Sequence, residues 1–286
     1  MPAPFSLRLL GLYPKKLGSS LVGMGARARI APGLRAKLIG GFAAHFGADV
    51  SEAEKPLLEY TSILDFFTRR LKPGLRPQAP AVPGGINSPV DGALLTAGRI
   101  ESGTLMQVKG LPYRLDELLA RDALAARFEE GAYASLYLAP KDYHRIHVPV
   151  PGAALAVGRV EGELWPVNDA STRHTPRLYV RNRRVYWIAE GRGSCEGLTV
   201  AVVMVAATHV GGVVLAPKWM PPGGLARRDR RELPGIPCES GDDLGAFELG
   251  STVVLLVGGP RSREWGVVRE PGPIRLGERL GALSAG

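Results

Sequence analysis

One long uncharged segment decides which fold classes this chain can adopt. Residues 197–217 contain no charged side chain, and their number is close to the roughly 20 that a helix needs to cross a bilayer. Valine, which is β-branched and favours strands, dominates the segment, the pair Gly211 and Gly212 interrupts it, and His209 lies inside it. We therefore predict two buried strands joined at the glycines, not a transmembrane helix.

Turn-forming residues extend this preference for strands to much of the chain. The 286 residues include 37 glycines and 24 prolines, which favours many short strands over a helical bundle. Strands are predicted at residues 93–97, 104–108, 134–138, 145–150, 184–189, 198–206, 212–215 and 252–257. Helices are predicted at residues 62–71 and 115–128. We expect an α+β fold, in which N-terminal helices precede a mainly antiparallel β sandwich or barrel-like core.

A stretch rich in proline and glycine, residues 73–85, separates these two parts. It places a predicted boundary between an N-terminal helical region, residues 1–75, and a β-rich domain, residues 76–286.

The positive charge of the chain is concentrated near its N-terminus. The formal net charge is +9, and residues 1–50 carry seven lysines and arginines against one acid, Asp49. Leucines and other apolar residues alternate with these cations, which is typical of a segment that lies on an anionic membrane surface. A signal peptide would need an uninterrupted apolar stretch, and a nucleic-acid-binding arm would contain less leucine. An amphipathic helix packed on its own domain stays open as an alternative, but we expect membrane contact and no nucleic-acid partner.

Common catalytic and metal-binding signatures are absent from the sequence. It contains no GxxxxGK[ST] loop, no GxGxxG after a strand, no HExxH and no GxSxG. Its two cysteines, Cys195 and Cys238, lack the CxxC spacing of zinc or redox sites. The usual signatures of phosphoryl transfer, dinucleotide redox chemistry, zincin proteolysis and α/β-hydrolase chemistry are therefore missing, and we expect no metal site.

Three short clusters could carry chemistry. In residues 88–92 (SPVDG), Asp91 either stabilises its own turn or takes part in a site. In residues 143–149 (YHRIHVP), a helix cannot continue past Pro149, so His144 and His147 do not share a helical face. The two histidines are either structural or suited to proton transfer.

The third cluster contains a candidate nucleophile. Residues 247–252 (FELGST) precede an apolar run, and Gly-Ser-Thr before a strand is usually a turn. Ser251 becomes a nucleophile only if a base and an acid can reach it.

In this order, the three clusters resemble those of the bacterial phosphatidylserine decarboxylase proenzymes. Residues 12–30 are similar to the membrane-binding start of that family. Residues 66–77 (FFTRRLKPGLRP) resemble its FFxRxLKPGxRP segment, and residues 162–168 (GELWPVN) resemble its G-x-L-x-x-V-N segment. The likeness therefore covers nearly the whole chain. His209 stands where the family has an aliphatic residue, and it receives no role.

The resemblance implies that the chain cuts itself. Asp91 would orient and charge His147, His147 would deprotonate Ser251, and the Ser251 oxygen would attack the carbonyl of Gly250. Gly250 suits this step because it has no Cβ to obstruct the nucleophile. β-Elimination would then break the bond between Cβ and Oγ of residue 251. This leaves a dehydroalanine, which becomes a pyruvoyl group at position 251. The products would be a β chain, residues 1–250, and an α chain, residues 251–286.

The resemblance also implies the reaction, the partners and the location. The pyruvoyl group would form a Schiff base with the amine of phosphatidylserine, CO2 would leave, and His144 would donate the proton that gives phosphatidylethanolamine. The α and β chains would form a heterodimer, and two such pairs a homodimer. The enzyme would be peripheral, on the cytoplasmic face of the bacterial inner membrane. Two alternatives remain: a serine hydrolase that uses Ser251, His147 and Asp91 on an external substrate, and a peripheral membrane protein without enzymatic activity.

Overall fold

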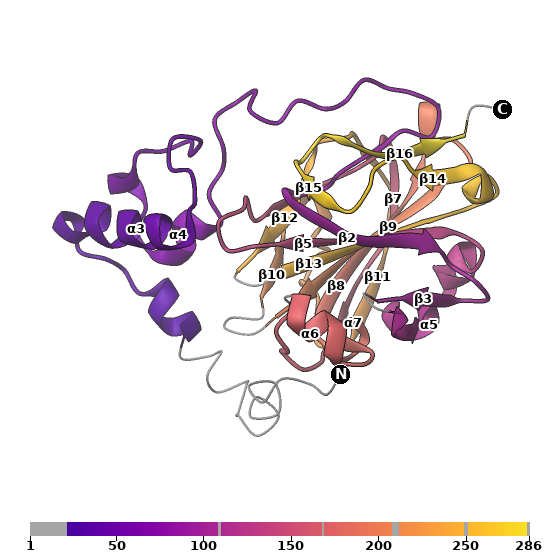
Figure 1. Ribbon diagram of the computed structural model, residues 1–286, viewed down its shortest axis with the longest axis horizontal. Helices are drawn as coiled ribbons and strands as arrows, with labels where there is room; N and C mark the ends of the chain where they lie inside the picture. The colour runs from indigo at the N-terminus through magenta and orange to yellow at the C-terminus, as the bar shows by residue number, and fades with distance from the viewer. Residues whose placement is uncertain (1–21, 108–109, 168, 208–211, 249–250, 285–286) are drawn as a thin grey trace.

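The structure is a computed structural model that describes residues 22–107, 110–167, 169–207, 212–248 and 251–284 (Figure 1). Residues 22–27 are helical, and the helices described from end to end are α3 (Pro32–Phe46), α4 (Ile63–Phe67), α5 (Leu115–Leu118), α6 (Asp169–His174) and α7 (Leu178–Arg181). The 3₁₀ turns are η1 (Leu57–Glu59), η3 (Ala123–Phe128), η4 (Gly193–Cys195), η5 (Pro217–Trp219) and η6 (Ser262–Glu264). The strands are β1 (Ile86–Asn87), β2 (Gly92–Arg99), β3 (Thr104–Met106), β4 (Pro112–Arg114), β5 (Ala132–Leu138), β6 (Arg145–His147), β7 (Gly152–Val160), β8 (Arg184–Gly191), β9 (Thr199–Ala206), β10 (Val213–Leu215), β11 (Asp229–Cys238), β12 (Asp243–Phe247), β13 (Ser251–Gly258), β14 (Trp265–Val267), β15 (Gly272–Ile274) and β16 (Arg279–Leu283).

An eight-stranded antiparallel sheet forms the centre of the molecule. Its strand order is β11-β7-β8-β9-β13-β5-β2-β15, so β13 lies between β9 and β5. The two end strands of this order do not pair with each other, and the sheet does not close into a barrel. The predicted α+β class with a mainly antiparallel core is confirmed.

Both faces of the central sheet are covered. Along β13, Val253 and Leu255 belong to one hydrophobic cluster, and the intervening Val254 and Leu256 belong to another. The first cluster includes residues of the small sheets β10-β12-β6 and β1-β16-β14, whereas the second includes residues of α5, η3 and α7. A strand that is covered on both faces needs apolar residues at every position, which explains the uninterrupted apolar runs in β9 and β13.

The valine-rich segment divides between two sheets. Its first part is β9, in which every residue is buried, as predicted. Its second part, β10, is not the buried strand that we expected: it pairs with β12 in a three-stranded sheet, and Val214 is half exposed because β10 is an edge strand. His209 and Gly211 lie outside the described residues.

The predicted helix over residues 115–128 is two short pieces. Ala120 and Arg121 both have positive φ, which breaks the helix between α5 and η3, and the Asp122 carboxylate then accepts a hydrogen bond from the N–H of Leu124. The helix predicted over 62–71 is the shorter α4, and the Ser62 side chain caps its first turn.

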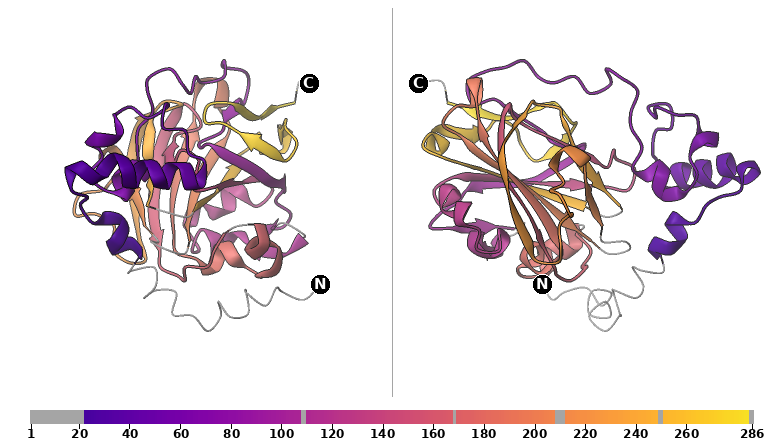
Figure 2. Two further views of the ribbon diagram at one scale, coloured as in Figure 1. Left: turned by 60° about the vertical axis from the view of Figure 1, so that its left-hand side comes forward. Right: turned by 180° about the vertical axis from the view of Figure 1, so that it is seen from behind.

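The N-terminal helices form a group beside the sheets. Figures 1 and 2 show α3 and α4 at one end of the molecule, joined to β1 by a long connection without helix or strand. Ile39, Ala43, Tyr60 and Phe66 form their own small hydrophobic cluster. No helix within the described ranges is long and apolar enough to span a membrane. The domain boundary at residue 75 stays a prediction.

Candidate functional site

The sheet topology brings the three sequence clusters to one place. Ser251, the first residue of β13, pairs with Leu138 at the end of β5. On the other side of β5, β2 begins at Gly92, whose backbone passes so close to Tyr137 that an added Cβ would lie 2.2 Å from the Tyr137 carbonyl oxygen. Neighbouring strands lie about 4.8 Å apart, so the backbones at Ser251 and Gly92 are separated by roughly 10 Å.

The histidine cluster is joined to the same edge. The N–H of Phe247, four residues before Ser251, donates to the carbonyl oxygen of His144 at 2.9 Å. The N–H of His147 donates to the carbonyl oxygen of Pro89, in the turn that carries Asp91, also at 2.9 Å. All three clusters therefore share backbone contacts around the end of β5.

The hydroxyl of Ser251 is buried in the protein interior. The residue is 0% exposed, and its Oγ has no hydrogen-bond partner among the described residues. A buried polar group without a partner costs about 1–3 kcal/mol and therefore needs an explanation, of which a catalytic role is one. Gly250, the other side of the predicted cleavage site, lies outside the described residues.

His147 is held as a neutral base. Its Nδ1 lies 2.7 Å from the carbonyl oxygen of Gly241, which can only accept, so Nδ1 carries the proton. Its Nε2 lies 3.1 Å from the hydroxyl of Tyr143. Burial raises the pKa of Tyr143 to about 12, so the phenol stays protonated and donates to Nε2. Burial also lowers the pKa of His147. The network therefore selects the tautomer with its lone pair on Nε2, the form that a general base requires.

Asp91 does not form the expected hydrogen bond with His147. Its Oδ2 accepts from Nη2 of Arg76 at 2.6 Å, and its Oδ1 accepts from Nε of Arg76 at 2.9 Å and from the N–H of Leu276 at 2.8 Å. Both carboxylate oxygens thus have partners, and His147 has Gly241 where a triad would place the aspartate. The physical reason is the guanidinium, which matches a carboxylate with two parallel hydrogen bonds.

His144 is fully buried and uncharged. Its Nδ1 donates to the carbonyl oxygen of Asp142 at 2.8 Å, and its ring packs on that of Phe67, with 3.9 Å between the centroids. Burial lowers the pKa of His144 to about 3. Its Nε2 has no hydrogen-bond partner among the described residues, so it presents a bare lone pair. A proton-donor role therefore requires that His144 first receives a proton.

A cavity of about 610 Å³ opens between the N-terminal segment and the core, beside this site. Its acidic and basic lining residues are Asp49, Glu52, Arg69, Arg76, Asp91, Lys141, Asp142, Arg269, Arg275 and Glu278, and Tyr137, Ala139 and Tyr143 also line it. Charges of both signs suit a polar, ionised ligand better than an apolar chain.

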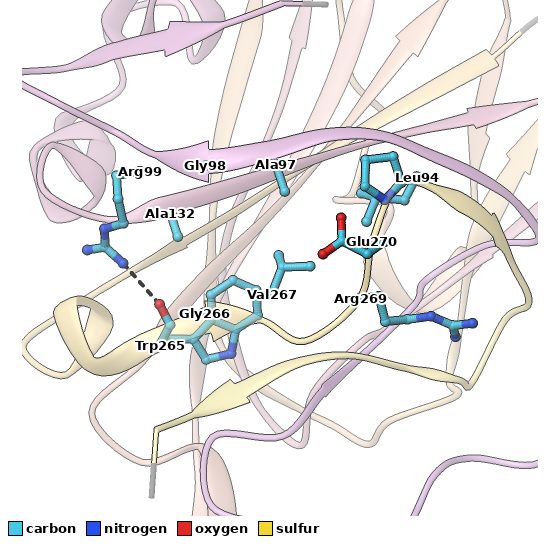
Figure 3. A pocket seen from close by; sticks show the side chains of 11 residues that line it. Leu94, Ala97, Gly98, Arg99, Ala132, Trp265, Gly266, Val267, Arg269 and Glu270 are labelled. Atoms are coloured by element: carbon cyan, nitrogen blue, oxygen red, sulfur yellow. Dashed lines mark hydrogen bonds between the residues drawn. The ribbon is translucent and has the colours of Figure 1, made fainter. Parts of the chain in front are cut away.

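A second cavity, of about 320 Å³, lies between β2 and the C-terminal strands (Figure 3). Arg99 reaches across it and donates to the carbonyl oxygen of Trp265 at 3.0 Å. None of the site residues predicted from the sequence lines this cavity, whereas Asp91 lines the first one. Ser251, His144 and His147 line neither cavity and lie beside the first one through their backbone contacts.

Three of the contacts described above were missed by the sequence analysis. Arg76 lies in the 66–77 segment and Tyr143 lies in the histidine cluster. Each therefore belongs to a motif that was recognised in the sequence, but neither residue was given a role. Gly241 acts through its carbonyl oxygen, and no side-chain pattern could have indicated it.

Comparisons with known proteins agree on one family. Residues 63–282 match the family model described as phosphatidylserine decarboxylase. The phosphatidylserine decarboxylase proenzyme of Anaeromyxobacter sp. (strain K) is 45% identical over 278 residues, which cover 95% of this chain and 91% of that protein. The proenzyme of Myxococcus xanthus (strain DK1622) is 36% identical, with 97% and 98% covered, and that of Acidovorax ebreus (strain TPSY) is 40% identical, with 94% of each covered.

Proposed function

The chain belongs to the phosphatidylserine decarboxylase family, and from this premise we propose that it cuts itself between Gly250 and Ser251 and then converts phosphatidylserine to phosphatidylethanolamine and CO2. The observation that carries the proposal is the Ser251 hydroxyl, which is buried and has no hydrogen-bond partner among the described residues. Ser251 is the first residue of the central strand β13 and pairs with the end of β5.

Self-cleavage uses the chain's own groups. The Ser251 Oγ attacks the Gly250 carbonyl carbon while His147 Nε2, after exchanging its bond with Tyr143, accepts the hydroxyl proton. The bond between the Gly250 carbon and the Ser251 nitrogen then breaks, and the proton passes to the freed amine. The product is an ester between the Gly250 carboxyl group and Oγ.

Elimination completes the maturation. Loss of the Ser251 Cα proton and cleavage of the Cβ–Oγ bond release the Gly250 carboxylate and leave a dehydroalanine. Addition of water and release of ammonia give a pyruvoyl group at the start of residues 251–286.

The surroundings of Ser251 fit this group. The Ser251 hydroxyl has no hydrogen-bond partner in the described part of the chain, so its loss breaks no hydrogen bond to these residues. The pyruvoyl group supplies an electrophilic carbonyl that can take up electrons when CO2 leaves. His144 Nε2, which also has no hydrogen-bond partner among the described residues, is the proposed carrier of the proton that replaces CO2.

The two fragments are well placed to stay together. Strand β13 is hydrogen-bonded to β5 on one side and to β9 on the other, and all its residues are buried. Strands β15 and β16 also pair with β2 and β1 of the larger fragment. These pairings support a noncovalent heterodimer of residues 1–250 and 251–286, and we retain the homodimer of such pairs as part of the proposal.

We propose peripheral attachment at the cytoplasmic face of the bacterial inner membrane. Within the described part of the N-terminal region, Met24, Leu34 and Leu38 are exposed apolar side chains, and Arg29 and Lys37 are exposed cations. Exposed apolar groups among cations suit an anionic lipid surface. The basic segment of residues 1–21 lies outside the described residues.

The test is a decarboxylation assay on vesicles that contain phosphatidylserine labelled in the serine carboxylate. We expect labelled CO2 with the native chain and none with Ser251→Ala. Equal release by both, or no release by a fully cleaved chain, would contradict the proposal. Labelling of the uncut chain by a fluorophosphonate would favour the serine hydrolase.

A further inference from the structure

The Arg76 guanidinium forms a two-point ion pair with the carboxylate of Asp91. Its Nε lies 2.9 Å from Oδ1 and 3.0 Å from Oδ2, and its Nη2 lies 2.6 Å from Oδ2. The two side chains are only 8% and 9% exposed. An ion pair with two-point geometry and little solvent is the strong form of this interaction.

The other edge of Arg76 is also occupied. Nη2 lies 2.7 Å from Oε2 of Glu52 and Nη1 lies 3.1 Å from Oε1. Glu52 belongs to the N-terminal segment, so the guanidinium is held by a carboxylate on each side.

Asp91 in turn fixes the turn that supports His147. Its Oδ1 accepts from the N–H of Leu276, and within the same turn the Ser88 hydroxyl donates to the carbonyl oxygen of Val90 at 2.7 Å. The carbonyl oxygen of Pro89 in this turn accepts from the backbone N–H of His147. Contacts therefore lead from Arg76 through Asp91 and the turn to the candidate base.

We propose that Arg76 is a positioning residue for self-cleavage, which holds the Asp91 carboxylate and its turn in the orientation that presents His147 to Ser251. The inference rests on the proposed function. The proposed role differs from general anchoring of the N-terminal segment, because it depends on the ion pair of Arg76 with Asp91 and not on its ion pair with Glu52. Without Arg76, the buried carboxylate would keep the N–H of Leu276 as its one described partner and would seek others, and the turn would move with it.

The experiment follows newly synthesised chain in a cell-free system and measures how fast the fragment of residues 251–286 appears. Loss of a charge-assisted pair predicts cleavage roughly 10- to 100-fold slower in Arg76→Ala than in the native chain. Free guanidinium, added below concentrations that alter the circular dichroism spectrum, is expected to restore part of the rate because it can occupy the vacated position. Glu52→Gln is expected to have a smaller effect, because it leaves the pair with Asp91 intact.

The matched control is Arg230→Ala. Arg230 also pairs with a buried carboxylate, that of Asp122, at 2.9 Å, but neither residue lines the cavity at Asp91. We expect this variant to cleave at nearly the native rate, with no response to guanidinium. If Arg76→Ala does not fold, Arg76→Lys replaces it; the proposal then requires slower cleavage than in the native chain at an equal folded fraction.

Three results would overturn the inference alone: native-rate cleavage in the Arg76 variant, a slow rate that guanidinium does not raise, or an equal loss in Glu52→Gln. A native chain that never cleaves would instead remove the proposed function, and this inference with it.

Discussion

The Nδ1 of His147 donates a hydrogen bond to the carbonyl oxygen of Gly241 over 2.7 Å. Because a carbonyl cannot donate, this contact fixes the imidazole tautomer and leaves the lone pair on Nε2. In a serine–histidine–aspartate triad the aspartate performs this task. Here a backbone carbonyl performs it, and Asp91 pairs with Arg76.

The first prediction concerns the hydroxyl of Tyr143, which occupies the lone pair of His147 Nε2. Removing it in Tyr143→Phe costs about 0.5–1.5 kcal/mol of hydrogen bonding but frees the base for Ser251. We expect self-cleavage at least as fast as in the native chain, measured as the rate at which fragment 251–286 appears. Cleavage more than about tenfold slower, which corresponds to a barrier raised by roughly 1.4 kcal/mol, would mean that Tyr143 relays the proton.

The second prediction concerns the stability effect of the Ser251 hydroxyl. Since this buried Oγ has no described partner, Ser251→Ala should not lower the free energy of unfolding and should raise it by up to about 1 kcal/mol. The comparison is made between His147→Gln and the double variant His147→Gln/Ser251→Ala, both expected to remain uncut, by urea unfolding. A loss above about 1 kcal/mol in the double variant would show that the hydroxyl has a stabilising partner.

The third prediction concerns the acid side of the stability profile. His144 has a pKa of about 3 in the folded chain, whereas an exposed histidine titrates near 6.5. Between these values the unfolded chain binds more protons, so the free energy of unfolding falls as the pH falls, by up to about 1.4 kcal/mol per pH unit from this group. Urea unfolding between pH 7 and pH 4, in the uncut Ser251→Ala background, should show a shallower decline in His144→Gln. Parallel declines in the two proteins would exclude this burial effect.

The fourth prediction concerns the close approach of β2 and β5. In Gly92→Ala the new Cβ would lie 2.2 Å from the Tyr137 carbonyl oxygen, and the strand would have to shift beside Asp91. We expect a loss of about 1–3 kcal/mol in the free energy of unfolding, measured in the Ser251→Ala background, and slower self-cleavage when Ser251 is present. Gly266→Ala is the control, because nothing lies within 4 Å of its added Cβ. Equal stability of the two variants would contradict the tight packing at Gly92.

The fold could be predicted where one sequence pattern extends without interruption over a whole strand. The valine-rich run indicated β9 because a strand covered on both faces must be apolar throughout. The prediction of one continuous helix over residues 115–128 was wrong, because the apolar spacing does not reveal the positive φ of Ala120 and Arg121. The burial of β10 was wrong as well, since only the sheet order shows that it is an edge strand.

The candidate site could be predicted as a set of residues but not as a set of contacts. Ser251, His147, His144 and Asp91 were identified by motif, and the topology does gather their segments around the end of β5. Which acceptor holds His147 depends on where Gly241 lies after folding, which no local pattern records. Their catalytic roles and the cleavage at Gly250 stay predictions.

The central claim is that the chain cuts itself before Ser251, and the most direct test is the intact mass of the purified protein under denaturing conditions. The account predicts two species, residues 1–250 and residues 251–286, with the smaller one lighter than its serine form by the mass of one ammonia. A single species with the mass of all 286 residues, or a small fragment that retains an unmodified serine, would contradict it.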